Sequence, residues 1–300
     1  MTLRGNPAIP RLEGKVALVT GAARGLGAGI SKAFMGTGVK VCATDVDEDD
    51  MAASFRGTEG IGTSLLTVPL DVADPGMFAD VVCRVLDHWG RLDVLVHAAA
   101  IMPVISLDDT SHDFWWKELG IHLGGLFNGA KAVRDAMRAH GGGHIISVAS
   151  RAGFFAYPNG VAYCVGKHGL EGFTKSLAIE WMPYNIAVNT MGPGSGKRIK
   201  PTGMTLEQAA QAPEDVRSTW TDPAVLGEGF VWLAGQPPAR FTGLCFDAGM
   251  VADALAAEGW NFDFAPGKVT PNPEDMRSRW EWQAQWEREE RHRQRPGGGR

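Results

Sequence analysis

The stretch Val16-Ala-Leu-Val-Thr-Gly-Ala-Ala-Arg-Gly-Leu-Gly27 decides the fold of this chain. A short apolar run passes into a glycine-rich turn, and a helical pattern follows to about Thr37. A buried strand, a glycine turn and a helix in this order predict the first unit of an α/β fold. Glycine lets a backbone approach a ligand closely, and the free amides at the start of a helix attract an anion such as a pyrophosphate.

Further apolar runs alternate with helical stretches along the chain. Strands are expected at Val39–Asp45, Leu65–Leu70, Leu92–His97, His144–Ala149, Ile186–Thr190 and Leu244–Asp247. Helices are expected at Asp74–Trp89, Asp109–His140, Ala162–Trp181 and Thr221–Ala234, with Asp74 as an N-cap and Pro75 at the first helical position. Apolar strands separated by helices predict a doubly wound parallel sheet, in three α/β/α layers, with the ligand beyond the carboxyl ends of the strands.

Composition excludes several classes of protein. The chain has 300 residues, is 44% hydrophobic and 21% charged, and carries a net charge of −5. This apolar content excludes a disordered chain, and the acidic balance gives no field for binding nucleic acid. We expect no metal site and a reduced, cytoplasmic setting, because the cysteines are isolated from one another: Cys42, Cys83, Cys164 and Cys245. We also expect no signal peptide, because residues 1–14 lack an apolar segment, and no membrane span, because no apolar run is long enough.

A carboxylate closes the second expected strand. Asp45 at that position can accept hydrogen bonds from a ribose 2′-hydroxyl and would repel a 2′-phosphate, which favours NAD over NADP. Arg24 in the glycine turn is the opposing signal, because a guanidinium can pair with a phosphate. Asp45 carries more weight than Arg24. The alternative is that Asp45 is a solvated turn carboxylate, because the acidic run continues through residues 47–50.

Tyrosine is scarce, and only one tyrosine has a lysine four residues later. Tyr163 and Lys167 share a helix face, where a cation can lower the pKa of a tyrosine and fit it for acid–base chemistry. Ser150 ends the fifth expected strand, directly before this helix, and its hydroxyl can bind a substrate oxygen. Ser147 is the alternative, but it lies within the strand.

These motifs resemble the classical short-chain dehydrogenase/reductase family over Leu12 to Gly249. The glycine turn matches T-G-x-x-x-G-x-G, and the Ser150–Tyr163 offset matches the catalytic pair of the family. The resemblance implies a Rossmann-type fold, hydride transfer between nicotinamide and a carbinol or carbonyl carbon, Tyr163 as acid/base, Ser150 as orienting group, and Lys167 as the group that lowers the tyrosine pKa and holds the nicotinamide ribose. By the same resemblance NAD would contact Gly21, Arg24, Gly25, Leu26, Gly27, Asp45, Asp71, Val72, Ala98, Tyr163, Lys167, Pro193, Gly194 and Thr202.

Three positions depart from the family pattern. His97-Ala98-Ala99-Ala100 replaces the usual N-N-A-G, so we expect the amides that tie this turn to its neighbours to be absent. His122 takes the place of a helix asparagine that, in the family, helps to hold a water for proton relay. Because imidazole titrates near neutrality, His122 is a candidate relay group. The alternative is a histidine packed within the helix. The usual residues after Pro193-Gly194 are missing, and Thr202 is the candidate replacement.

The loops beside the expected nicotinamide site are apolar. Phe154, Phe155, Tyr157 and Met204 predict a pocket for a hydrophobic, medium-sized secondary alcohol or ketone, with cyclic compounds among the candidates. The leading hypothesis is an NAD-dependent alcohol dehydrogenase. The alternatives are a non-catalytic dinucleotide-binding sensor and an NADP-dependent carbonyl reductase.

The chain is expected to form one catalytic domain, residues 1–250, followed by an extension, residues 251–300. Within the extension residues 274–294 read as a helix, with Trp282 and Trp286 on one face, packed either on the chain itself or on a neighbouring subunit. The long helices Asp109–His140 and Ala162–Trp181 correspond to those that pair subunits in the family, which implies a homotetramer or homodimer.

Overall fold

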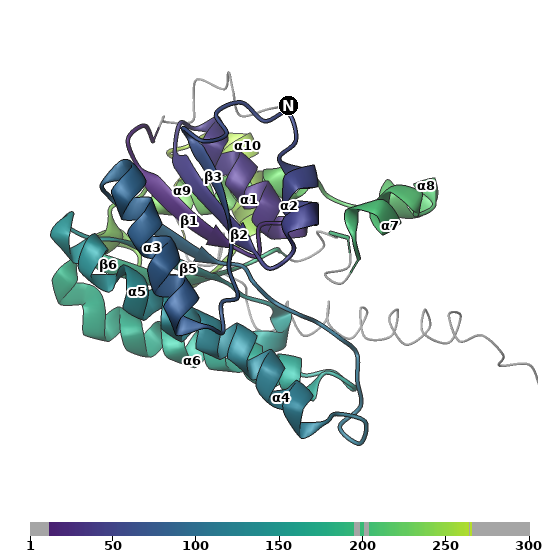
Figure 1. Ribbon diagram of the computed structural model, residues 1–300. Helices are drawn as coiled ribbons and strands as arrows, with labels where there is room; N and C mark the ends of the chain where they lie inside the picture. Colours follow the sequence, from purple (N-terminus) through teal and green to yellow (C-terminus); the bar gives the residue numbers. More distant parts are fainter. Residues whose placement is uncertain (1–11, 195–198, 201–203, 264, 266–300) are drawn as a thin grey trace, which may run out of the picture.

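The computed structural model describes residues 12–194, 199–200, 204–263 and 265. Seven parallel strands form one sheet in the order β3-β2-β1-β4-β5-β6-β7 (Figure 1). The strands are β1 (Val16–Thr20), β2 (Lys40–Asp45), β3 (Leu65–Pro69), β4 (Val94–His97), β5 (Gly143–Val148), β6 (Ile186–Gly192) and β7 (Cys245–Asp247). Every strand expected from the sequence is present, with its ends shifted by at most two residues.

Helices cover both faces of this sheet, which confirms the three-layer architecture. The helices are α1 (Gly25–Gly36), α2 (Glu48–Ser54), α3 (Pro75–Trp89), α4 (His112–Leu119), α5 (Gly125–Ala139), α6 (Val161–Trp181), α7 (Leu206–Gln211), α8 (Glu214–Arg217), α9 (Pro223–Ala234) and α10 (Ala248–Glu258), with single turns at η1 (Gly120–Gly124), η2 (Arg151–Gly153), η3 (Met182–Tyr184) and η4 (Pro238–Arg240). Alternate residues of β1 point into two separate cores. Ala17 and Val19 pack with α1, α9 and α10, whereas Val16 and Leu18 pack with α3, α5 and α6.

The connection order reverses between β1 and β4. The chain runs from β1 outward to β3 on one side and from β4 outward to β7 on the other. At the carboxyl edge Thr20 lies in register with Thr44 on one neighbour and His97 on the other. A crevice at such a reversal is where ligands bind in open α/β sheets, so this edge is the place to look for a site.

The long helix expected over residues 109–140 is divided in two by a π-helical turn, η1, between α4 and α5. The turn runs from Gly120 to Gly124, and the next residue, Gly125, has no room for a side chain. A Cβ on Gly125 would come within 2.7 Å of the His97 ring and 2.8 Å of Val72. Wider turns of this kind often mark functional sites, and this one carries His122.

The start of the predicted extension belongs to the core of its own chain. The sequence did not predict the helix α10, which ends at Glu258. Two aromatic residues after it pack on the same chain. The Phe262 ring stacks on Trp232 with centroids 4.9 Å apart, and Trp260 packs against Gly235. The predicted helix at 274–294 and its tryptophans lie outside the described residues, as does Thr202. Among the residues that are described, none of the helices is long and apolar enough to span a membrane.

Candidate active site

The glycine turn after β1 forms a backbone cradle at the crevice. Gly21 and Gly25 have φ values of 66° and 56°, and a Cβ on Gly27 would lie 2.1 Å from the Gly21 carbonyl oxygen. The cap residue of α1, Arg24, gives no side-chain hydrogen bond to the first amides of the helix within the described structure. With Leu26 buried beneath them, these amides are free for an anionic group.

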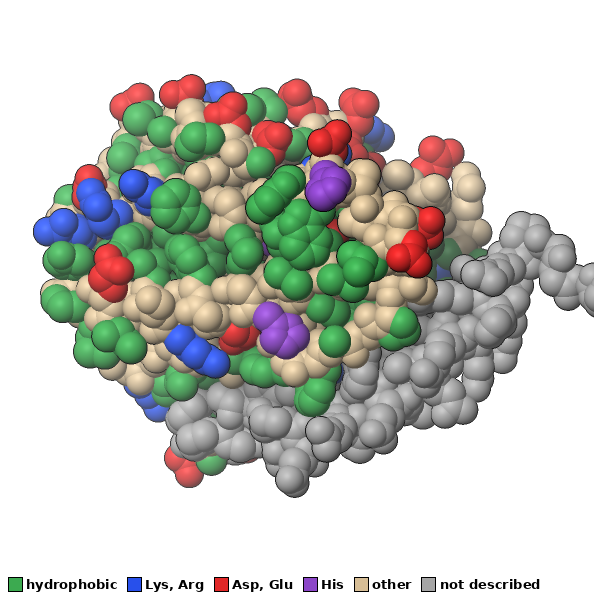
Figure 2. Space-filling model, turned by 90° about the horizontal axis from the view of Figure 1, so that it is seen from below, with side chains coloured by type: hydrophobic (Ala, Val, Ile, Leu, Met, Phe, Trp, Pro, Cys, Tyr) green, Lys and Arg blue, Asp and Glu red, His purple; other side chains and the backbone are tan. Residues whose placement is uncertain are grey.

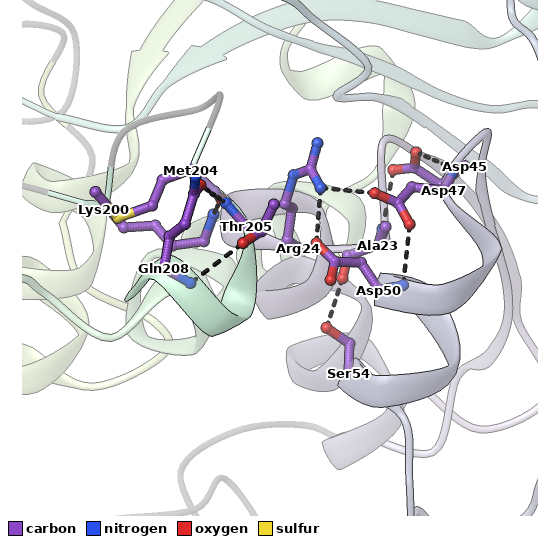
Figure 3. Close-up of polar contacts among 10 residues, drawn as sticks. All are labelled: Ala23, Arg24, Asp45, Asp47, Asp50, Ser54, Lys200, Met204, Thr205 and Gln208. Carbon is purple, nitrogen blue, oxygen red and sulfur yellow. Dashed lines mark hydrogen bonds and ion pairs between the residues drawn. The ribbon is translucent and has the colours of Figure 1, made fainter. Parts of the chain in front are cut away.

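Asp45 at the end of β2 is tied to this turn. Its carboxylate accepts hydrogen bonds from the amides of Ala23 at 3.0 Å and Asp47 at 3.1 Å. Arg24 does not point freely into the crevice, because its Nη1 donates to Asp47 at 2.8 Å and to Asp50 at 2.7 Å (Figure 3). Asp45, which favours NAD, and Arg24, which favours NADP, therefore belong to one cluster of acidic side chains around the guanidinium.

The turns after β3 and β4 lie at the same carboxyl edge of the sheet. Val72 is buried and its carbonyl accepts a hydrogen bond from Asn128 at 3.0 Å, while Asp71 is exposed and caps the amide of Ala73. Asn128 was missed in the sequence, since a lone asparagine within a helix carries no local signal. The amide of Ala98 donates to the hydroxyl of Thr20 at 3.2 Å.

The side-chain amides expected to be absent from the turn after β4 are absent, and the imidazole of His97 makes links in their place. Its Nδ1 lies 3.2 Å from the hydroxyl of Thr20, and its Nε2 lies 3.1 Å from the carbonyl of His122. A nitrogen that faces a carbonyl must be the protonated one, so Nε2 donates and Nδ1 accepts. Burial lowers the pKa of His97 to about 4, which keeps it neutral. The imidazole thus ties the turn after β4 to both β1 and η1.

His122 is fully buried beside the tyrosine of the predicted catalytic set. Its ring meets that of Tyr163 edge-on, with centroids 5.4 Å apart, and its Nε2 donates to the carbonyl of Ile101 at 3.1 Å. Gly166 makes room for it, because a Cβ there would lie 2.4 Å from Nδ1. Burial lowers the pKa of His122 to about 2. The expectation that it titrates near neutrality is therefore wrong, since a charged imidazole would lose its hydration here.

Ser150, Tyr163 and Lys167 come together at the carboxyl end of β5. The Ser150 hydroxyl lies close enough to Tyr163 to act on the pKa of its phenol, and it accepts a hydrogen bond from the amide of Ala152 at 3.2 Å. Lys167 lies one turn along α6, where its Nζ donates to the carbonyl of Val148 at 2.8 Å and sits 5.6 Å from the centre of the Tyr163 ring. Ser147 is buried within β5, as its place in the strand predicted.

Burial shifts both titrating groups of this set toward their neutral forms. It raises the pKa of Tyr163 to about 12, with the Ser150 hydroxyl acting in the opposite direction, and it lowers the pKa of Lys167 to about 8. The expected lowering of the tyrosine pKa by Lys167 does not decide its value in this arrangement. The Lys167 ammonium is held by a backbone carbonyl. The loss of water around the Tyr163 phenol raises its pKa by more than the lysine charge lowers it.

The apolar residues predicted for the substrate fall in two places. Tyr157 lies next to the catalytic set, with its ring centroid 6.3 Å from that of Tyr163, and Phe154 and Phe155 are partly exposed on the same loop. Met204 lies apart from them, where its carbonyl accepts a hydrogen bond from Lys200 at 2.6 Å, beside Arg24 (Figure 3). Lys200 and Met204 thus lie on the side of the glycine turn.

The Pro193-Gly194 turn packs against the end of β7. Gly194 has a φ of 111°, and a Cβ on it would lie 2.7 Å from the Asp247 carboxylate. Only glycine fits there, so the turn is held at the carboxyl edge of β6, on the side of the crevice that also carries Ser150.

Glu118 is a further acidic group at this site that the sequence did not bring to notice. It is 1% exposed on α4, one helical turn before His122, and burial raises its pKa to about 7 while Lys167 acts in the opposite direction. The only signal in the sequence is its i, i+4 spacing from His122, which is too common to single it out.

Comparison with known proteins agrees with this geometry. Residues 15–211 match the family model described as short chain dehydrogenase. The chain is 38% identical to trans-4-hydroxycyclohexanecarboxylate dehydrogenase of Sinomonas cyclohexanicum over 65% of this chain and 77% of that protein, and 37% identical to D-threitol dehydrogenase of Mycolicibacterium smegmatis over 61% and 70%. It is also 34% identical to 3-alpha-(or 20-beta)-hydroxysteroid dehydrogenase of Mycobacterium bovis over 88% and 98%.

The fold has close counterparts among solved structures. One from Sinorhizobium meliloti 1021, described as a putative short-chain alcohol dehydrogenase, superposes with a TM-score of 0.69 at 29% identity, covering 79% of this chain and 95% of that one. The sheet order, the glycine cradle, the Ser150–Tyr163–Lys167 set and the family match agree with one another. The chain belongs to the short-chain dehydrogenase family.

Proposed function

We propose that the protein is an NAD-dependent dehydrogenase that interconverts a hydrophobic secondary alcohol, cyclic compounds included, and its ketone by hydride transfer. The observation that carries the proposal is the convergence of Ser150, Tyr163 and Lys167 at the carboxyl edge of the sheet, beside an uncapped glycine cradle. A hydroxyl pair with an adjacent lysine suits proton transfer to and from an alcohol oxygen. The three relatives reported above are named as dehydrogenases, which supports the same reaction class.

The cradle fits a dinucleotide. Backbone atoms occupy the space that a Cβ would need at Gly21 and Gly27, so the turn packs tightly against the start of α1. Gly25 and Leu26 would present their amides to the pyrophosphate, Asp45 would bind the adenosine ribose, Asp71 and Val72 would flank the adenine, and Ala98, Pro193 and Gly194 would line the nicotinamide end. When bound, the nicotinamide accepts or supplies the hydride.

The acidic cluster favours NAD over NADP. Asp45 is held in place by two backbone amides, and Arg24 is paired with two further carboxylates. A 2′-phosphate would meet these negative charges, and the guanidinium that could attract it is already neutralised.

The catalytic residues divide the work between them. Ser150 would hold the substrate oxygen by a hydrogen bond, and Tyr163 would take its proton during oxidation and return it during reduction. Lys167 lies close enough to the ring to stabilise the phenolate that oxidation requires. Because burial raises the pKa of Tyr163 to about 12, the free enzyme holds this proton firmly, and oxidation is expected to run faster as the pH rises.

The substrate side is formed by aromatic groups. Tyr157 next to Tyr163, with Phe154 and Phe155 on the same loop, suits an apolar ring better than a polyol. A panel that contains cyclohexanol, trans-4-hydroxycyclohexanecarboxylate and D-threitol, assayed with NAD and with NADP, tests the proposal. We expect NAD-linked oxidation of the ring alcohols that is lost in Tyr163→Phe; equal activity of that variant would refute the mechanism.

A second candidate function is a non-catalytic dinucleotide sensor. It is favoured by the two buried histidines, His97 and His122, which replace the residues usual in the family and do not titrate near neutrality. The intact Ser150–Tyr163–Lys167 set argues against it. Tight dinucleotide binding without turnover on any alcohol of the panel would support the sensor.

We also propose a homodimer or homotetramer in a reducing, cytoplasmic setting. Large apolar side chains are exposed across α4, α5 and α6, where Trp116 is 67% and Ile179 75% exposed, along with Phe127 and Val165; Figure 2 shows hydrophobic side chains spread over the underside of the molecule. Exposed apolar helix faces are typical of surfaces that contact another subunit. Trp116→Glu is expected to lower the mass in solution, and an unchanged mass would contradict contact through α4.

A further inference from the structure

His122 is a buried histidine that takes no part in the proposed reaction steps. It is 0% exposed, and its Nδ1 has no hydrogen-bond partner among the described residues. Burial lowers the pKa of His122 to about 2, so the ring stays neutral and does not take up the proton that alcohol oxidation releases. Leaving a buried nitrogen unpaired costs free energy, so the other contacts of this residue have to account for its place.

The backbone of His122 is fixed to the centre of the sheet. Its carbonyl lies in the π-helical turn η1 and accepts a hydrogen bond from Nε2 of His97, at the end of β4, at 3.1 Å. Nδ1 of His97 accepts in turn from the hydroxyl of Thr20, at the end of β1, at 3.2 Å. These three residues form one line of contacts from the glycine turn to η1, and a shift of His122 would break it.

The imidazole of His122 holds the loop after β4. The ring Nε2 donates a hydrogen bond to the carbonyl of Ile101 at 3.1 Å. Further along this loop Ile105 pairs with Gly160 in an isolated parallel bridge, and Gly160 lies against the Tyr157 ring, where a Cβ would come within 2.3 Å of it. The loop therefore runs from a hydrogen bond on His122 to the aromatic side of the proposed substrate site.

The same imidazole contacts the tyrosine of the catalytic set. It meets Tyr163 edge-on, with centroids 5.4 Å apart and an angle of 79° between the planes, which is a favourable geometry for aromatic rings. The helix α6 can approach the imidazole because residue 166 is glycine; a Cβ on Gly166 would lie 2.4 Å from Nδ1 of His122. The imidazole thus limits where the Tyr163 ring and its hydroxyl can lie.

We propose that His122 is a positioning residue with two separate effects: its ring places Tyr163 for proton transfer, and its Nε2 holds the loop after β4 against the proposed substrate site. Loss of the ring would let the Tyr163 hydroxyl move away from the substrate oxygen, whereas loss of the donor would loosen one wall of the substrate site. The effect on the reaction rests on the proposed function, but the hold on residues 101–105 does not.

Two substitutions separate these contacts. His122→Gln keeps an N–H donor at the same number of bonds from the Cα as Nε2, but it removes the ring. His122→Phe keeps an aromatic ring beside Tyr163, but it removes the donor and leaves the Ile101 carbonyl unpaired. His112→Gln and His112→Phe, on an exposed histidine of α4, are the matched controls and should behave as the wild type.

The first test measures amide hydrogen exchange of the full chain, free of ligand, in the segments 101–106 and 158–161. Exchange should be about tenfold faster in His122→Phe than in the wild type, because the loop has lost its hydrogen bond to the ring. In His122→Gln it should stay close to the wild-type rate. Equal exchange in His122→Phe and the wild type would overturn the hold of His122 on the loop.

The second test measures kcat and KM for cyclohexanol with saturating NAD between about pH 6 and pH 9. His122→Gln should lower kcat by about tenfold with KM changed little, because a small displacement of a reacting group slows the chemical step. His122→Phe should raise KM by about tenfold with kcat changed little, because the wall of the substrate site is looser. His122→Leu, which has neither ring nor donor, should show both changes.

The pattern across these variants decides the proposal. Equal changes of kcat and KM in His122→Gln and His122→Phe would overturn it, because they would show a general disturbance of the fold. The loss of a step in the pH profile of kcat in either variant would also overturn it, because His122 would then titrate. If the wild type oxidises no alcohol of the panel, the proposed function fails, and the exchange rates still decide whether His122 holds the loop.

Discussion

The two ends of the crevice treat charge in opposite ways. At the proposed ribose end, Arg24 at the start of α1 is half-buried and bonded to Asp47 and Asp50, at the start of α2, at 2.8 and 2.7 Å. At the catalytic end, between α4 and α6, Glu118 and His122 are almost fully buried, and each keeps a polar atom without a partner among the described residues.

This difference has a physical meaning. Paired charges near water hold a fixed charge state, which suits a surface that must select between two cofactors. Unpaired groups away from water have displaced pKa values, which suits a site where a proton has to move. In the proposed function, one end of this edge would select the cofactor and the other would carry out the chemistry, and the following substitutions test that division.

Among the substitutions outside the Ser150–Tyr163–Lys167 set, the largest effect is expected from Asp45, at the end of β2. Asp45→Ala removes the carboxylate proposed to bind the ribose, so NAD binding should weaken by about 10- to 100-fold, the range for a hydrogen bond to a charged group. Titration calorimetry with NAD measures the change. Glu48→Ala removes an exposed neighbouring carboxylate and serves as control. Unchanged NAD affinity in Asp45→Ala would contradict the assignment.

A smaller effect is expected from releasing Arg24. The double variant Asp47→Asn/Asp50→Asn frees the guanidinium, so the affinity for 2′,5′-ADP should rise by about tenfold relative to that for ADP. Asp49→Asn has the same kind of charge change on an exposed residue that makes no recorded contact with Arg24. If one Asp49→Asn substitution gives half of the gain or more, the effect is overall charge and not the pairing of Arg24.

The smallest effect is expected at His97, which joins the two ends. His97→Asn can reach one of its two partners but not both, so the free energy of unfolding should fall by about 1 kcal/mol, measured by urea unfolding. Because burial lowers the pKa of His97 to about 4, its stabilising effect is present above pH 6.5 and is lost as the pH falls through about 4. His112→Asn, which changes an exposed histidine, is the control. An equal loss of unfolding free energy in the two variants would contradict the structural role of His97.

What the sequence could predict was local. The glycine turn, the Asp74 cap with Pro75, and the Tyr163–Lys167 spacing each depend on neighbours within a few residues, and the structure places them as expected. The π-turn, the links made by His97 and the burial of Glu118 depend on contacts between distant elements. His97 and His122 are 25 residues apart, yet the imidazole of one bonds the backbone of the other. Spacing alone carries no record of such pairings.

The central claim is that the catalytic end moves a proton through Tyr163, and one measurement tests it most directly. The rate of NADH formation from cyclohexanol is compared between the wild type and Tyr163→Phe, with NAD held at saturation for both as judged by calorimetry. We predict a loss of about 10²- to 10⁴-fold in kcat with NAD affinity changed little, because the ring remains and only the hydroxyl is removed. A Tyr163→Phe variant that keeps the wild-type rate would contradict the claim.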